Sequence, residues 1–176
     1  MGIYIVNYRH RNSEPLKSIM ELPKEEAEKI AEELYEKSEC KAHRRFGVNF
    51  LNYYDDRLKL EKWLYDSFIS IGGKPKKKHP LYFVLEASDK FHQYYEMGEV
   101  IRMCLDDIED YDVSFTLGDS MEQMYTTNNL QVFSKQKLME YIRKYNNVHE
   151  FLNHIKAKYS IVEVQLWNNV TEEMSV

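Results

Sequence analysis

The chain has 176 residues, of which 43% are hydrophobic and 14% aromatic, and its formal net charge is −5 at pH 7. This composition suits one domain with a full hydrophobic core, excludes a disordered chain, and argues against a general nucleic-acid-binding protein. With no apolar run long enough for a signal peptide or a membrane span, and with two separated cysteines, the chain is expected to be a soluble cytoplasmic protein with reduced thiols.

The first half of the chain is predicted to contain one strand and two amphipathic helices. Residues 3–8 are mostly β-branched or aromatic and predict a strand. From Pro23 to Lys37, apolar residues recur at three- and four-residue spacing, which is typical of one face of a helix. The same spacing predicts a second helix from about Val48 to Ile71, which Gly72-Gly73 ends.

The second half is predicted to mix short strands with short helices. Strands are expected at residues 81–86, 113–117 and 160–167. Residues 99–105 alternate between apolar and other side chains, which favours a strand, and a helix is the alternative. Ser88, Ser134 and Asn147 occupy positions where the N-caps of three further helices are expected.

The order of these elements favours the α+β class. Strands and helices do not alternate regularly, and no Pro/Gly/Ser-rich linker divides the chain. We therefore expect a single α+β domain over residues 1–176, with a central mixed or antiparallel sheet of about five short strands and a helix-rich N-terminal half packed on it.

No motif for a metal site is complete, and none is assigned. His149 and His154 are five residues apart, whereas two zinc-binding imidazoles on one helix face need i,i+4 spacing.

The stretch Gly118-Asp119-Ser120 is similar to the first block of hydrolases with a nucleophilic serine, but no Asp-x-x-His follows it. A turn at the end of a strand is therefore the preferred interpretation.

Four lysines, Lys74, Lys76, Lys77 and Lys78, form a local basic loop. The P-loop pattern is absent there, and the rest of the chain is acidic. We therefore expect a solvated surface loop rather than a nucleic-acid-binding site.

Polar side chains recur on one side of two predicted strands. Ser114 and Thr116 share a side because successive side chains alternate across a strand, and Glu163 and Gln165 share a side of strand 160–167. Trp167 lies on the same side as Glu163, and so large a side chain indicates that this face is partly covered. Partial burial is expected to raise the pKa of Glu163, unless a donor such as His79 or the hydroxyls of Ser114 and Thr116 stabilises its charged form.

Together with His79, just before a predicted strand, these residues resemble ADP-ribosyltransferase-like domains. In that family an early strand brings an Arg or His, a later strand carries a Ser-x-Ser/Thr step, and a final strand carries the catalytic Glu. The resemblance implies NAD as cofactor, with Glu163, Ser114 and Thr116 in the catalytic group and His79 and Tyr82 in the cofactor-binding group.

This resemblance implies a coherent chemistry. Cleavage of the nicotinamide–ribose bond develops oxocarbenium character, which a carboxylate such as Glu163 stabilises. The order Glu163-Val164-Gln165 reverses the usual family pattern, so a catalytically degenerate NAD-binding protein is included in the hypothesis. The alternative function is a non-catalytic binding or interaction protein without a cofactor, whose polar strand faces are simply solvated.

Overall fold

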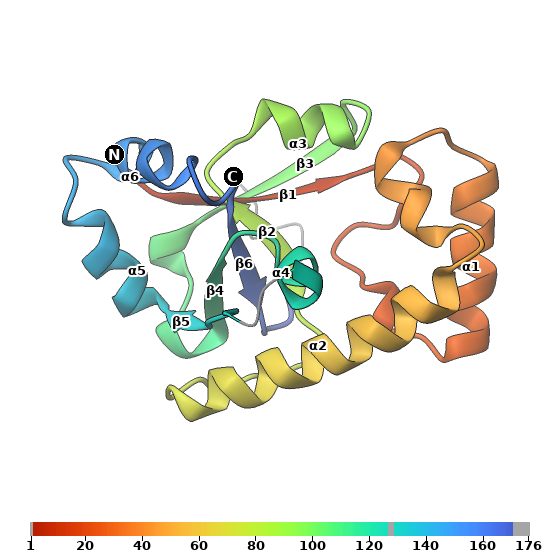
Figure 1. Ribbon diagram of the computed structural model, residues 1–176, viewed down its shortest axis with the longest axis horizontal. Helices are drawn as coiled ribbons and strands as arrows, with labels where there is room; N and C mark the ends of the chain where they lie inside the picture. Colours follow the sequence, from red (N-terminus) through yellow and green to blue (C-terminus); the bar gives the residue numbers. More distant parts are fainter. Residues whose placement is uncertain (1, 127–128, 171–176) are drawn as a thin grey trace.

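The computed structural model describes residues 2–126 and 129–170, and within them the chain forms a six-stranded antiparallel sheet with the order β3-β1-β2-β6-β4-β5 (Figure 1). The strands are Tyr4–Arg9 (β1), Leu81–Leu85 (β2), Glu99–Cys104 (β3), Val113–Leu117 (β4), Phe133–Ser134 (β5) and Val162–Leu166 (β6). The expected α+β class is confirmed. The helical alternative for residues 99–105 is wrong, because β3 pairs with β1 along its whole length.

Six α-helices occur in the described part of the chain, and none combines the length and hydropathy that crossing a membrane requires. They are Lys24–Glu36 (α1), Phe50–Ser70 (α2), Asp89–Tyr94 (α3), Ser120–Thr126 (α4), Lys135–Ile142 (α5) and Val148–Ile155 (α6). The three expected N-caps are confirmed, since Ser88, Ser134 and Asn147 each accept a hydrogen bond from a first-turn N–H. Gly72, with φ +97°, follows α2, as the sequence predicted.

One face of the sheet forms the main apolar core, which α5 and α6 cover (Figure 1). Alternate residues of the strands, such as Phe83, Phe115 and Val164, point into it and are at most 2% exposed. Leu138 of α5 and Phe151 of α6 pack against them. This side of the sheet is therefore largely filled by side-chain packing.

Helix α2 covers part of the opposite face (Figure 1). Its buried residues Leu64 and Phe68 pack on Trp167, which follows β6 and is fully buried. The rings of Phe68 and Trp167 stack with their centroids 5.9 Å apart. The expectation that the Trp167 side of β6 is covered is confirmed.

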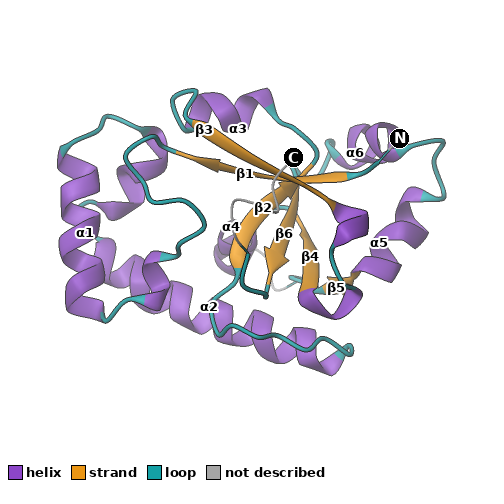
Figure 2. Ribbon diagram, turned by 180° about the vertical axis from the view of Figure 1, so that it is seen from behind, coloured by secondary structure: helices purple, strands orange, loops and turns teal. Residues whose placement is uncertain are grey.

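Helix α1 does not extend this cover over the sheet. Its buried residues Ala27 and Ala31 pack with Phe46 and Phe50 in a second apolar core, formed by α1, the start of α2 and the 3₁₀ segment Lys41–Phe46. Figure 2 shows α1 beside the sheet rather than on it. The N-terminal helices therefore form one wall of a space whose floor is the sheet.

The lysine loop is anchored to the fold, which differs from the expectation of a solvated loop. The Lys76 ammonium lies 3.0 Å from Oδ2 of Asp112, a residue only 2% exposed. Lys77 has a side chain only 13% exposed and forms an ion pair with Glu21 at 2.6 Å. The backbone N–H groups of both lysines also donate to the carbonyl of Trp167. Only part of this loop is free surface.

Replacement of Lys76 with serine should lower the free energy of unfolding by about 1 kcal/mol. Within the described part of the chain, the Asp112 carboxylate would keep only Asn168 as a side-chain donor, and its buried Oδ1 has no partner there. Lys78→Ser is the matched control, since Lys78 is exposed in the same loop and should change stability by less than about 0.5 kcal/mol. Urea unfolding at pH 7 measures both, and equal midpoints for the two variants would contradict the anchoring role.

Candidate functional site

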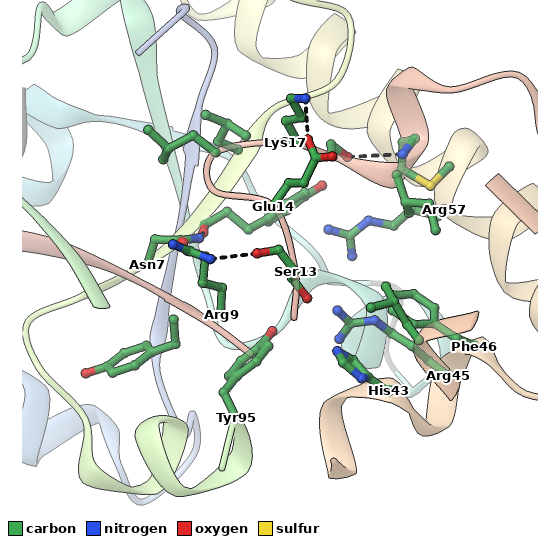
Figure 3. A pocket seen from close by; sticks show the side chains of 18 of the residues that line it. Asn7, Arg9, Ser13, Glu14, Lys17, His43, Arg45, Phe46, Arg57 and Tyr95 are labelled. Atoms are coloured by element: carbon green, nitrogen blue, oxygen red, sulfur yellow. Dashed lines mark hydrogen bonds and ion pairs between the residues drawn. The ribbon is translucent and has the colours of Figure 1, made fainter. Parts of the chain in front are cut away.

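A pocket of about 940 Å³ lies between the sheet and the N-terminal helices (Figure 3). The sheet contributes its polar face, and α1, α2, the loop after β1, the 3₁₀ segment 41–46 and α3 contribute the walls. The floor includes Val6, Tyr8, Tyr82, Val84 and Glu163. This volume falls within the range of about 300–1,000 Å³ that small-molecule sites occupy.

Glu163 is the carboxylate on the floor of this pocket, and it is 6% exposed. Its Oε1 accepts hydrogen bonds from the Ser120 hydroxyl at 2.6 Å and from the Gln165 amide at 2.9 Å. Among residues 2–126 and 129–170, its Oε2 has one hydrogen bond, a long contact of 3.4 Å from the N–H of Ser120. One oxygen is thus fixed by the protein, and the other keeps acceptor capacity for a ligand.

The surroundings raise the pKa of Glu163 to about 7. Burial is the largest cause, and the negative charge of Asp119 acts in the same direction. The charge of Arg57 and the hydrogen bonds from Ser120 and Gln165 oppose the shift. The expected rise is confirmed, and it allows this carboxyl group to exchange a proton near neutral pH, as acid–base and charge-stabilising groups in active sites do.

A chain of buried hydrogen bonds holds Glu163 from behind. The Trp167 indole donates to Ser114 at 2.8 Å, and the Ser114 hydroxyl donates to Oε1 of Gln165 at 2.8 Å. The Gln165 amide then donates to Thr116 at 3.1 Å and to Glu163 at 2.9 Å. The strand register explains this arrangement, because Ser114 pairs with Gln165 and Thr116 with Glu163.

The structure therefore brings three predicted site residues together but gives them different positions. Glu163 reaches the pocket, whereas Ser114 and Thr116 are fully buried and do not line it. The two hydroxyls touch Gln165, which in turn touches Glu163. In this arrangement Ser114 and Thr116 position the carboxylate rather than contact a ligand.

Ser120 is the serine that contacts Glu163 directly, and it is not among the site residues predicted from the sequence. The interpretation of residues 118–120 as a turn is correct, since Gly118 has φ +81° and Ser120 begins α4. This turn directs the Ser120 hydroxyl onto Glu163. The antiparallel pairing of the strand before the turn with β6 is the signal that would have placed Ser120 there.

A second buried carboxylate, Glu61 of α2, organises the wall of the pocket. It is 1% exposed. Its carboxylate accepts hydrogen bonds from the Arg57 Nε at 3.0 Å and from the Tyr82 hydroxyl at 3.2 Å, and it lies 2.6 Å from the His79 Nδ1. The guanidinium of Arg57 also lies 3.8 Å from the ring centre of Tyr82. Of the two predicted cofactor-binding residues, Tyr82 lines the pocket, whereas His79 does not and contacts Glu61 instead.

The electrostatics of this wall keep Arg57 charged and Tyr82 neutral. Burial alone would lower the pKa of Arg57, but Tyr82, Tyr53 and the two carboxylates Glu61 and Glu163 raise it well above its ordinary value. Burial, together with the same carboxylates, raises the pKa of Tyr82 against the opposing effect of Arg57. The pocket therefore presents a permanent cation beside a carboxylate that titrates near pH 7.

Among residues 2–126 and 129–170, no group of three or more His, Cys, Asp and Glu side chains is arranged to hold a metal ion. No protein-family model matches the chain, and no curated protein or solved structure is significantly similar to it.

Proposed function

We propose that the pocket is the active site of an enzyme acting on a small molecule, and that Glu163 is its catalytic carboxylate. The observation that carries this proposal is the carboxyl group of Glu163, with a pKa of about 7, on the floor of a ligand-sized pocket. Burial of this group beside Asp119 destabilises its charged form, and carboxyl groups with such strongly raised pKa values cluster at functional sites.

The reaction that fits this carboxylate best is cleavage of a glycosidic bond, and NAD is the substrate that the sequence resemblance suggests. The C–N bond between ribose and the cationic nicotinamide breaks, and its electron pair leaves with nicotinamide, which becomes neutral. Water or another acceptor adds to the ribose carbon and releases one proton to the solvent. Oε2 of ionised Glu163 accepts a hydrogen bond from a ribose hydroxyl and stabilises the oxocarbenium charge. Tyr82, Tyr53 and Tyr95 line the same pocket and supply aromatic surfaces for a ring.

The other predicted residues act through their neighbours in this proposal. Ser114 and Thr116 hold Gln165, and Gln165 holds Glu163 in one orientation. His79 anchors Glu61, which fixes Arg57 against Tyr82. A site fixed in this way loses little free energy to reorganisation during the reaction.

Nicotinamide release from NAD tests this proposal directly. Glu163→Gln should lower the rate by about 10²-fold, because it removes the charge that meets the oxocarbenium ion, while NAD affinity measured by calorimetry stays within about twofold. The wild-type rate should rise with pH through about 7, since the ionised carboxylate is the active form.

Glu122→Gln is the control for that experiment, because Glu122 is exposed on α4, near the site but outside the pocket. It should match the wild type in rate and affinity. Absence of NAD binding at millimolar concentration would exclude NAD as the substrate. An unchanged rate in Glu163→Gln would exclude this carboxylate as the catalytic group.

A non-catalytic ligand-binding protein is the second candidate function. The observation that favours it is the complete burial of Ser114, Thr116 and Gln165, which form a rigid support that binding alone also requires. In that case the wild type binds a ligand in the pocket without converting it, and product analysis after prolonged incubation distinguishes the two functions.

A further inference from the structure

We infer that the pocket contains an anion-binding subsite formed by the guanidinium groups of Arg45 and Arg57, and that its ligand carries a phosphate group. The inference rests on the proposed function for the assignment of this pocket as the ligand site. It does not depend on which bond, if any, the protein cleaves.

Arg45 differs from the other cations that line the pocket because it has no acidic partner. Within the described residues 2–126 and 129–170, no carboxylate lies within 4.0 Å of its guanidinium, whereas Arg9 pairs with Glu99, Lys17 with Glu14 and Lys37 with Glu33. The Arg45 guanidinium is instead held by aromatic rings, 4.8 Å from the centre of Phe46 and 6.0 Å from that of Tyr53. Its charge is therefore positioned but not neutralised by the protein.

Arg57 supplies the second half of the subsite. Its Nε donates to Glu61, and the two terminal nitrogens form no hydrogen bond with the part of the chain that the structure describes. Contact with Glu61 and Tyr82 fixes the orientation of the guanidinium, so the remaining donors are presented to the pocket. Arginine binds phosphate well in this arrangement because its planar group offers several donors in a fixed geometry.

The two guanidinium groups are close enough to repel each other. The charge of Arg57 acts to lower the pKa of Arg45, which places the two cations in the same electrostatic environment. Figure 3 shows both side chains entering the pocket from the same wall, with their guanidinium groups directed inward. Bringing two like charges together costs free energy, and an anion bound between them offsets that cost.

The chemistry of this subsite favours phosphate over a carboxylate. Two cations match the double charge of a phosphate monoester or of the two phosphates in a dinucleotide, whereas one carboxylate neutralises only half of it. The neighbouring His43 contributes no charge at neutral pH, because burial, followed by the effects of His10 and Arg45, lowers its pKa to about 4. The two arginines contribute a charge of about +2, and the Glu61 carboxylate paired with Arg57 reduces the net charge of the subsite to about +1.

The subsite also lies near the proposed reacting group. Arg45, Arg57 and Glu163 all line the same pocket, so the anion site and the carboxylate can contact one ligand. A ligand bound to both would carry its phosphate close to the sugar carbon that Glu163 faces. This geometry indicates a nucleotide rather than a free sugar or a neutral nucleoside.

Calorimetric titration of the whole chain with inorganic phosphate and with pyrophosphate tests the inference. Both anions should bind at low salt, more weakly as salt rises, and acetate at the same concentration should not compete. Arg45→Met should weaken phosphate binding at least tenfold. The affinity of Arg45→Lys should lie between those of the wild type and Arg45→Met, because lysine keeps the charge but lacks the planar set of donors. Arg44→Met is the matched control, since Arg44 and Arg45 are both exposed neighbours in the same segment and only Arg45 lines the pocket; this variant should bind within about twofold of the wild type.

The result separates this inference from the proposed function. Phosphate binding that is lost in Arg45→Met, without any release of nicotinamide, supports the subsite and refutes the NAD reaction. Nicotinamide release that is unchanged in Arg45→Met, together with absence of phosphate binding in the wild type, overturns the subsite and leaves the reaction standing. Phosphate binding that Arg44→Met and Arg45→Met weaken equally also overturns it, because general surface charge would then explain the binding.

Discussion

Glu61→Ala should lower the free energy of unfolding by about 3 kcal/mol, the largest stability loss that we expect from a single polar substitution in this chain. The Glu61 carboxylate is 1% exposed and is shared by Arg57, His79 and Tyr82. Its removal leaves the largely buried Arg57 guanidinium without its ion-pair partner and the Tyr82 hydroxyl without its acceptor. Urea unfolding at pH 7 measures the loss.

The same helix provides the control for Glu61. Lys62 and Asp66 form an ion pair at the same i,i+4 spacing as Arg57 and Glu61, but their side chains are 75% and 58% exposed. Asp66→Ala should therefore cost less than about 0.5 kcal/mol. The double variant Arg57→Met/Glu61→Met should be more stable than Glu61→Ala, since it removes both charges together. Equal losses in Glu61→Ala and Asp66→Ala would show that burial of the pair has no energetic weight.

Glu163→Gln should change the free energy of unfolding more favourably at pH 8 than at pH 5, by up to about 3 kcal/mol. Folding raises the pKa of Glu163 from 4.5 to about 7, so the folded protein binds this proton more tightly than the unfolded chain does. The contribution of the group is most favourable below pH 4.5 and is lost as pH rises to about 7. Glutamine keeps a similar shape without the charge and thereby removes the loss.

Comparison of urea unfolding at pH 5 and pH 8, for the wild type and the variant, isolates this group from the other titrating side chains. The difference between the two proteins should grow with pH, and Glu122→Gln should show no such growth because Glu122 is exposed. A constant difference across this range would mean that Glu163 titrates normally and that the pocket floor is better hydrated than its burial indicates.

Local signals predicted most of the secondary structure. The N-caps Ser88, Ser134 and Asn147 were recognisable because a short polar side chain satisfies first-turn N–H groups in any context. The strand Phe133–Ser134 was missed because two residues are too few to show alternation. The position of α1 beside the sheet was also not predictable, since an apolar stripe does not specify its partner.

Part of the candidate site was predictable for a similar reason. Alternation along a strand placed Glu163 and Gln165 on one side, and the pairing with β4 supplied their hydrogen-bond partners. The facing residues Arg57 and Glu61 were not predictable. They have the same spacing and the same order of charges as the exposed pair Lys62–Asp66, and tertiary packing makes one pair buried and the other solvated.

The central position of β6 bears on how the chain folds while it is being made. β6 lies between β2 and β4, so until residues 162–166 emerge from the ribosome, the strands β3-β1-β2 and β4-β5 have no strand to join them. During that interval both halves expose unpaired edges, which favour aggregation and engagement by chaperones. Glu163 and Gln165 arrive on this same strand, so a nascent chain cannot assemble the pocket floor, and ligand can stabilise only a chain in which β6 is already in place.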